Sequence, residues 1–242
     1  MPAPHTTDTD QPRPDLGARP APTAQRPLLG QTVLLVEDSR FASEAVRLLA
    51  LRSGARIRRA DCMASAERHL LTYRPGVAIV DLGLPDGSGL DLIARLARAT
   101  QRPNVLLATS GQAPDAVEAE AMAAGADGFL PKPVESLAVF QQAILRHLPH
   151  DLRPRGLRVI GSESVEPDRL ALSEDLIHAD RLLSDERVSP RFVAEFLTGL
   201  ARTGHDAVLL AETQGLAART MDELRPVLRR LIAERLDDRR VV

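Results

Sequence analysis

The sequence is poor in aromatic residues and cysteine. Its 242 residues include no tryptophan, one tyrosine, five phenylalanines and one cysteine. So few aromatic rings leave little surface on which nucleic-acid bases can stack. The single cysteine, Cys62, excludes an internal disulfide and is typical of a reducing compartment. A formal net charge of −2 gives no broad basic field for nucleic acid.

The chain also lacks a long hydrophobic run. No apolar stretch approaches the roughly 20 residues of a membrane helix, and the start MPAPHTTDTD has neither the basic nor the apolar region of a signal peptide. We therefore expect a soluble, cytoplasmic protein with no membrane partner. A length of 242 residues is long for one ordinary domain and sufficient for two.

Lysine is the rarest charged residue. Lys132, in the string FLPKPV, is the single lysine among 31 basic residues, and all the others are arginine. A lysine that persists against this bias indicates a position that needs a compact ammonium group rather than a planar guanidinium.

Four further polar residues follow apolar runs. Glu37 and Asp38 end VLLVED, Asp81 ends VAIVD, and Thr109 follows VLLA. Taken singly, each has an ordinary structural explanation as a helix N-terminal charge, a turn residue or a local hydrogen-bonder, and Lys132 as a solvated charge. Their order, with separations of 43, 28 and 23 positions from Asp38 to Lys132, favours one common site.

Short apolar runs alternate with stretches of helical period from residue 32 onward. The expected strands are TVLLVE, ARIRRA, GVAIVD, NVLLAT and DGFL. Nearly continuous apolar strands indicate burial on both faces, which predicts an α/β fold with a doubly wound, five-stranded parallel sheet. In such a sheet the ligand site forms at the carboxyl ends of the strands, where these polar residues fall.

The residue types predict phosphoryl chemistry. Asp38 and Asp81 placed together would repel each other unless a cation lay between them, and Mg²⁺ is the natural choice. Asp81 opens the turn-rich loop DLGLPDGSG, so we expect its carboxylate to attack a phosphoryl group and form an acyl phosphate. Lys132 would neutralise the phosphoryl oxygens, and the Thr109 hydroxyl would donate a hydrogen bond to one of them.

Residues 32–147 resemble the receiver domain of two-component response regulators. The resemblance implies a flavodoxin-like sheet, a metal-bound water held by Glu37, and the Gly83 carbonyl as a backbone metal ligand beside Asp38 and Asp81. It also implies that Phe129 acts as a switch residue together with Thr109. The bond between Lys132 and Pro133 is typically cis in that family. Receivers tune the phosphoryl lifetime with side chains at the positions of Gly83 and Gly111, so the lifetime stays open here.

The domain organisation follows from these patterns. Residues 1–30 read as a disordered, Pro-rich tail, 31–148 as the receiver domain, 149–167 as a linker, and 168–242 as a small all-α helical bundle. Within the bundle, a helix from Ser189–Pro190 to Gly204 would bury Phe192, Val193, Phe196, Leu197 and Leu200. Thr220 and Glu223 predict a capping box, although Pro226 suggests that the last helix begins later.

The expected output is protein association. From Asp151 onward there are fifteen arginines, no lysine and seventeen acidic residues, with no helix-turn-helix signature. His178 and His205 lack the Lys and Gly found three and four residues after a phosphotransfer histidine. We expect the bundle to bind a protein partner or a second copy of the chain, and Val193, Leu197 and Leu200 are candidate exposed apolar positions for that contact.

The whole chain is thus predicted to be a response regulator. It would accept a phosphoryl group on Asp81 from a sensor histidine kinase or a phosphotransfer protein. It is not expected to be an enzyme that turns over an external substrate, and it would dephosphorylate itself slowly. DNA is not an expected partner. The alternative is a phosphorylation-controlled transcription regulator that contacts DNA through helices at 189–203 and 220–236.

Overall fold

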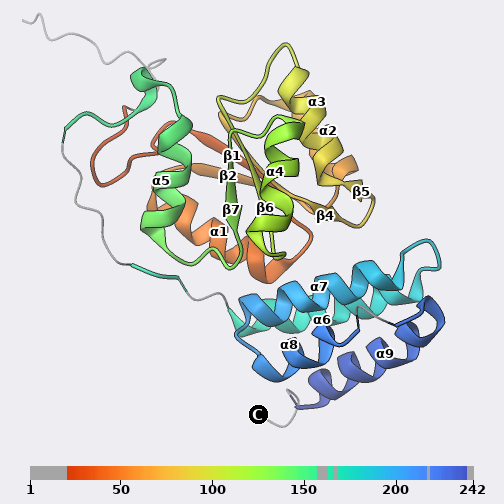
Figure 1. Ribbon diagram of the computed structural model, residues 1–242. Helices are drawn as coiled ribbons and strands as arrows, with labels where there is room; N and C mark the ends of the chain where they lie inside the picture. Colours follow the sequence, from red (N-terminus) through yellow and green to blue (C-terminus); the bar gives the residue numbers. More distant parts are fainter. Residues whose placement is uncertain (1–20, 157–162, 166–167, 217–218, 239–242) are drawn as a thin grey trace, which may run out of the picture.

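The computed structural model describes residues 21–156, 163–165, 168–216 and 219–238. Figure 1 shows an α/β part followed by a separate group of helices. The predicted tail at residues 1–20 lies outside the described residues, as do 157–162 and 166–167 of the predicted linker.

A parallel sheet forms the centre of the first part. Its strands are β1 Thr32–Val36, β2 Arg56–Ala60, β3 Val77–Asp81, β6 Val105–Ser110 and β7 Gly128–Pro131. In the described chain they pair in the order β2-β1-β3-β6-β7. The predicted doubly wound five-stranded sheet is confirmed.

Helices cover both faces of this sheet, as Figure 1 shows. They are α1 Arg40–Arg52, α2 Met63–Thr72, α3 Gly89–Arg98, α4 Pro114–Ala124 and α5 Leu137–His147. Alternate residues of β1 point to opposite cores: Val33 and Leu35 pack with α1 and α5, whereas Leu34 and Val36 pack with α2, α3 and α4. Burial on both faces explains why the strands are apolar throughout.

A short antiparallel ribbon follows Asp81. It consists of β4 Gly83–Leu84 and β5 Gly87–Ser88, and the sequence did not predict it. A Cβ atom at Gly89 would collide with the Asp81 carbonyl, so glycine lets the chain fold back over the end of β3. The ribbon thereby fixes the backbone on which Asp81 is carried.

The ordered core extends beyond the predicted domain limits. Leu28, in the predicted tail, is fully buried in the core of α1 and α5, and its N–H donates to the Ser53 carbonyl at 2.9 Å. Val165, in the predicted linker, is buried in the same core and its N–H donates to the Glu135 carbonyl. A 3-10 turn, η1 His150–Leu152, follows α5. Apolar side chains in both flanking segments pack on the core of the α/β part.

The chain ends in further helices around a core of their own. They are α6 Arg169–Ser184, α7 Pro190–Thr203, α8 Ala207–Gln214 and α9 Met221–Asp238, and we call them the C-terminal helices. As predicted, Ser189 caps α7 and Gly204 ends it. Before α9, the Thr220 N–H donates to Glu223 Oε2 at 3.0 Å, which is one half of a capping box.

Two expectations for these helices are wrong. Val193, Leu197 and Leu200 are not available to a partner, since they are 0%, 0% and 3% exposed within the core. Phe41 of α1 lies in the same cluster, so a residue of the α/β part helps to cover this face of α7. Pro226 lies inside α9, which begins at Met221 rather than after the proline.

Candidate functional site

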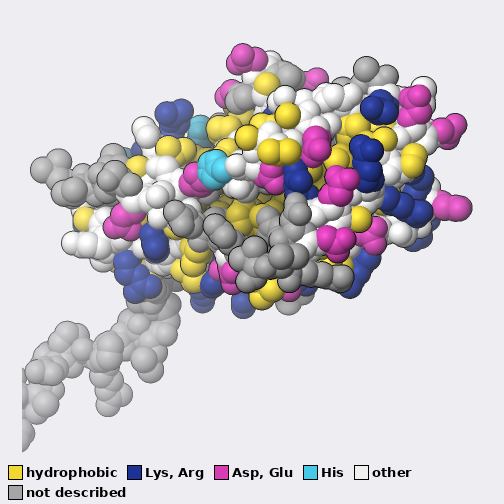
Figure 2. Space-filling view, turned by 90° about the horizontal axis from the view of Figure 1, so that it is seen from below, with side chains coloured by type: hydrophobic (Ala, Val, Ile, Leu, Met, Phe, Trp, Pro, Cys, Tyr) yellow, Lys and Arg dark blue, Asp and Glu magenta, His cyan; other side chains and the backbone are white. Residues whose placement is uncertain are grey.

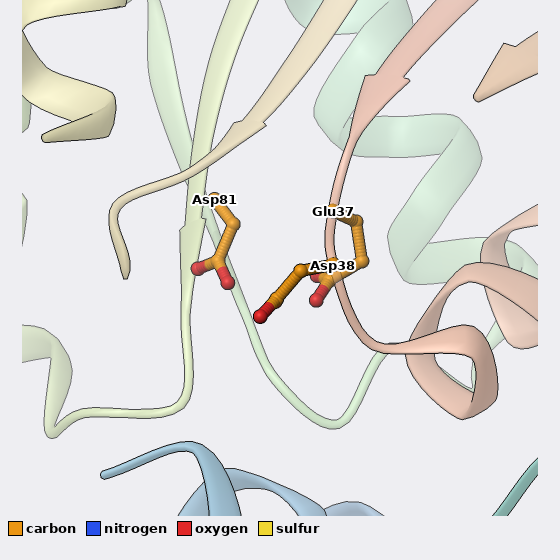
Figure 3. A group of neighbouring side chains, drawn as sticks. All are labelled: Glu37, Asp38 and Asp81. Atoms are coloured by element: carbon orange, nitrogen blue, oxygen red, sulfur yellow. The ribbon is translucent and has the colours of Figure 1, made fainter. Parts of the chain in front are cut away.

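Three carboxylates meet at the carboxyl edge of the sheet. Glu37 and Asp38 follow β1, and Asp81 is the last residue of the neighbouring strand β3. One oxygen of each lies within 4.8 Å of those of the other two, and all three residues are buried. Figure 3 shows the three side chains converging from these two strand ends. The structure therefore brings the predicted acidic residues together.

Lys132 completes the group from the end of β7. Its Nζ lies 2.6 Å from Glu37 Oε2 and 2.8 Å from Asp81 Oδ2, and its side chain is 10% exposed. The peptide bond from Lys132 to Pro133 is cis, as the resemblance implied. We call Glu37, Asp38, Asp81 and Lys132 the carboxylate site.

Burial dominates the electrostatics of this site. It raises the pKa of Asp81 to about 7, with Lys132 acting in the opposite direction and Glu37 adding to the rise. Burial also raises the pKa of Asp38 well above its ordinary value, and Glu37 and Asp81 raise it further. Burial alone would lower the pKa of Lys132, but Asp81 and Glu37 together raise it. Three carboxylates and one ammonium group leave the site short of positive charge.

The donor set fits a hard cation. Asp38 Oδ2 is buried and has no hydrogen-bond partner among the described residues. A buried carboxylate oxygen without a partner is destabilising, so this oxygen is available to a cation. An Mg²⁺ ion takes carboxylate oxygens of this kind. The backbone of Gly83 hydrogen-bonds to the Asp81 carboxylate, while the predicted role of the Gly83 carbonyl as a metal ligand stays a prediction.

Thr109 and Phe129 lie beside the carboxylate site on β6 and β7. Thr109 is paired in register with Asp81, but its hydroxyl donates to the Leu130 carbonyl at 2.7 Å. To reach a group on Asp81, the hydroxyl must leave Leu130. Phe129 is half-buried at the edge of the core formed with α2, α3 and α4. The switch roles of both residues stay predictions.

Two residues that sequence reasoning missed hold the loop after β1. Arg59 of β2 donates to the carbonyls of Glu37 and Asp38, at 3.2 and 2.6 Å. Asp175 of α6 accepts hydrogen bonds from Ser39 Oγ at 2.7 Å and from the first two N–H groups of α1, at 2.7 and 2.9 Å. Nothing in the local sequence marks Asp175, because its partners lie more than 130 positions away.

Helix α7 lies opposite the carboxylate site. Between them is a cavity of about 280 Å³, which we call the interdomain cavity. On the α7 side it is lined by Phe192, Glu195, Phe196, Thr198, Gly199, Leu200, Arg202 and Thr203. The blue ribbon in Figure 3 shows this part of the chain next to the three carboxylates.

The two histidines of the C-terminal helices are not in the interdomain cavity lining. His178 is half-buried with its ring edge against Phe196. His205 is exposed, and its Nε2 lies 2.8 Å from Glu135 Oε1. That neither histidine transfers a phosphoryl group stays a prediction.

Comparison with known proteins identifies the first part of the chain. The family model of the response regulator receiver domain matches residues 33–144. The virulence transcriptional regulatory protein PhoP of Salmonella typhimurium is 34% identical over 117 residues, which are 47% of this chain and 51% of PhoP. The KDP operon transcriptional regulatory protein KdpE of Escherichia coli is 32% identical over 118 residues, 48% of this chain and 52% of KdpE.

Solved structures match the same region. The chemotaxis response regulator CheY4 of Vibrio cholerae has a TM-score of 0.45 and 23% identity, covering 49% of this chain and 98% of its own. This chain spans about half the length of the curated relatives it matches.

Proposed function

We propose that this protein is a two-component response regulator whose phosphoacceptor is Asp81. The premise is that residues 33–144 match the response regulator receiver domain. The donor is the phosphohistidine of a sensor histidine kinase or of a phosphotransfer protein. The state of Asp81 is then passed to the C-terminal helices.

One observation carries this proposal. Lys132, the single lysine of the sequence, places its Nζ between Glu37 and Asp81 in a buried site that still lacks positive charge. A phosphoryl group on Asp81 would lie beside this ammonium group, which can neutralise its oxygens. A solvated surface lysine would make no such pair of buried contacts.

The transfer step follows from these contacts. An Asp81 carboxylate oxygen attacks phosphorus, and the new O–P bond forms as the N–P bond of the donor breaks. The imidazole nitrogen takes the electron pair and then a proton from water. Lys132 holds the phosphoryl oxygens in place, so that positioning and charge neutralisation supply most of the catalysis.

The metal is Mg²⁺ in this proposal. Asp38, Asp81 and the Gly83 carbonyl would hold it, with Glu37 acting through a bound water. When bound, the ion supplies positive charge against the carboxylates and the phosphoryl oxygens. The unpartnered Asp38 Oδ2 supports this assignment.

Thr109 would change its hydrogen-bond partner when Asp81 is phosphorylated. Its hydroxyl leaves the Leu130 carbonyl and donates to a phosphoryl oxygen, and Phe129, on the same strand as Leu130, would reorient with it. This exchange alters the contact between β6 and β7. The protein is a phosphoacceptor with slow autodephosphorylation rather than a turnover enzyme.

Labelling with a small phosphodonor tests the assignment. With Mg²⁺ and acetyl phosphate, intact-mass spectrometry should show one added phosphoryl group, and Asp81→Asn should abolish it because an amide is a poor nucleophile and a poor metal ligand. Asp91→Asn, an exposed change in α3, is the matched control and should label normally. Full labelling of Asp81→Asn would disprove the proposed acceptor.

The output is proposed to be protein association in the cytoplasm, with a protein partner or a second copy of the chain. Since Val193, Leu197 and Leu200 are buried, the contact must use other positions. Leu170 of α6 and Val208 of α8 are 65% and 62% exposed. Light scattering with and without acetyl phosphate should show a phosphorylation-dependent change in mass if a second copy is the partner.

In the described ranges, no helix is long and apolar enough to cross a membrane.

DNA binding is the second candidate. PhoP and KdpE are named as transcriptional regulators, so the comparisons give no support to the expectation that DNA is excluded. Acidic and basic side chains are interspersed on the face drawn in Figure 2, however, which is not typical of a DNA-binding surface. A DNA-shift titration against salt distinguishes the two candidates, because phosphate contacts give a steep salt dependence.

A further inference from the structure

The C-terminal helices cover the carboxylate site. Figure 1 shows α6 and α7 next to α1, below the sheet, and α7 forms the far wall of the interdomain cavity. Contacts at two glycines show how close the cover is. A Cβ at Gly83 would lie 4.0 Å from Phe192 Cε2, and one at Gly111 would lie 3.3 Å from the Cα of Gly199. The backbone of α7 thus packs on the loop that follows β6.

Hydrogen bonds to Asp175 hold the C-terminal helices on the receiver domain. Asp175 is 0% exposed and satisfies the first two N–H groups of α1, which an isolated helix leaves without partners. Ser39, the N-cap residue of α1, donates its hydroxyl to the same carboxylate. Because Ser39, the N-cap residue of α1, directly follows Asp38, this contact lies at the edge of the carboxylate site.

Apolar packing supports the same contact. Phe41, also in the first turn of α1, is 5% exposed and belongs to the core of the C-terminal helices together with Val193 and Leu197. Polar and apolar contacts of one helical turn therefore both depend on the covered arrangement.

The cover distinguishes donors by size. The interdomain cavity of about 280 Å³ is slightly smaller than the usual range of small-molecule pockets. It has room for a small phosphodonor. A phosphohistidine on a protein must bring its own helix or loop to Asp81, and α7 already occupies that space.

We infer that the C-terminal helices act as a donor-selecting cover. With the cover closed, small phosphodonors reach Asp81 and phosphohistidine proteins do not, so transfer from a kinase requires the contact at Asp175 to open first. This inference rests on the proposed function and adds the class of donor that each arrangement accepts. The labelling rate with a protein donor then scales with the fraction of molecules that are open.

The test compares two donors that share a leaving group. N-phosphoimidazole is small, and an autophosphorylated sensor kinase presents the same phosphorylated imidazole on a protein. Initial labelling rates are measured on the full chain as wild type, Asp175→Ala and Glu174→Ala. The control removes only an exposed ion pair with Arg40, whose side chains are 60% and 43% exposed, and such pairs contribute little.

Asp175→Ala should raise the ratio of kinase to phosphoimidazole labelling roughly fivefold or more, within the usual range of coupling between sites. Glu174→Ala should leave the ratio unchanged. An equal ratio of kinase to phosphoimidazole labelling in all three proteins would overturn the inference. So would a result in which the kinase labels none of the three proteins while phosphoimidazole labels them. Failure of phosphoimidazole to label any of them would instead overturn the proposed function.

A cross-link tests the same point without removing a buried residue. Arg40→Cys and Glu174→Cys, in a Cys62→Ser background, place exposed thiols on either side of the contact for a short bismaleimide. The linked protein should lose kinase labelling and keep phosphoimidazole labelling, relative to the same variant before linking. Kinase labelling at the unlinked rate would show that the cover does not need to open.

Discussion

Gly199 of α7 lies so close to Gly111 that a Cβ atom added at Gly111 would be 3.3 Å from the Gly199 Cα. Gly111 comes two residues after Thr109, at a position where the sequence offers no side chain to shield the carboxylate site. Backbone of the C-terminal helices fills that space instead. A side chain at Gly111 would therefore crowd the closed arrangement.

Gly111→Val should push α7 away from the receiver domain. Its branched side chain overpacks the contact, which typically destabilises a packed arrangement by about 1–3 kcal/mol. Small-angle X-ray scattering should show a larger radius of gyration than in the wild type. Gly199→Val is the matched control, because a Cβ at Gly199 meets nothing within 4 Å. An equal change in both variants would mean that the glycine contact does not hold the parts together.

Lys132→Arg should impair switching although it preserves the charge. The Lys132 side chain is 10% exposed between Glu37 and Asp81, and a planar guanidinium cannot replace a compact ammonium group there. We expect phosphorylated protein to form, but with a smaller conformational response by hydrogen exchange at β6 and β7. Arg102→Lys, at the ion pair with Asp127 outside the site, is the control. Wild-type behaviour of Lys132→Arg would refute the argument from the single lysine.

The receiver fold and its site could be predicted because they depend on local patterns. Apolar runs define the strands, and parallel strands bring Asp38, Asp81 and Thr109 to one edge whatever the surrounding loops do. The contacts of Asp175 and the covering of α7 by Phe41 could not be predicted in this way. Both depend on how two parts of the chain pack together, and neither the period of a helix nor the spacing of charges specifies that contact. Leu28 was missed because two adjacent leucines in a Pro-rich segment give no periodic signal.

Phe41→Ala should destabilise the C-terminal helices although Phe41 belongs to the receiver domain. The ring is 5% exposed and lies in the core formed by α6, α7 and α9. Removing a buried phenylalanine side chain costs about 3 kcal/mol or more. Denaturant unfolding followed by circular dichroism should show earlier loss of helix. Leu71→Ala, at an 89% exposed position of α2, should change stability by less than about 0.5 kcal/mol. Equal stability of both variants would exclude Phe41 from the shared core.

His178 should make the C-terminal helices sensitive to acid. Burial lowers its pKa below the ordinary 6.5, with Arg59 of β2 acting in the same direction. Arg181 on α6 and Arg40 on α1 lower it further, and Asp61 after β2 opposes them. The ring Nε2 is buried and has no partner among the described residues, so the neutral form fits this environment.

The sign of the effect follows from proton binding. Between the lowered pKa of the folded state and 6.5, the unfolded chain binds more protons at His178, so stability rises with pH in that window. The contribution is complete above pH 6.5 and is lost as the pH falls through the window. Thermal unfolding of His178→Gln should depend less on pH there than that of the wild type, whereas His150→Gln, at an exposed position, should retain the full dependence. An unchanged pH dependence in His178→Gln would mean that another group causes it.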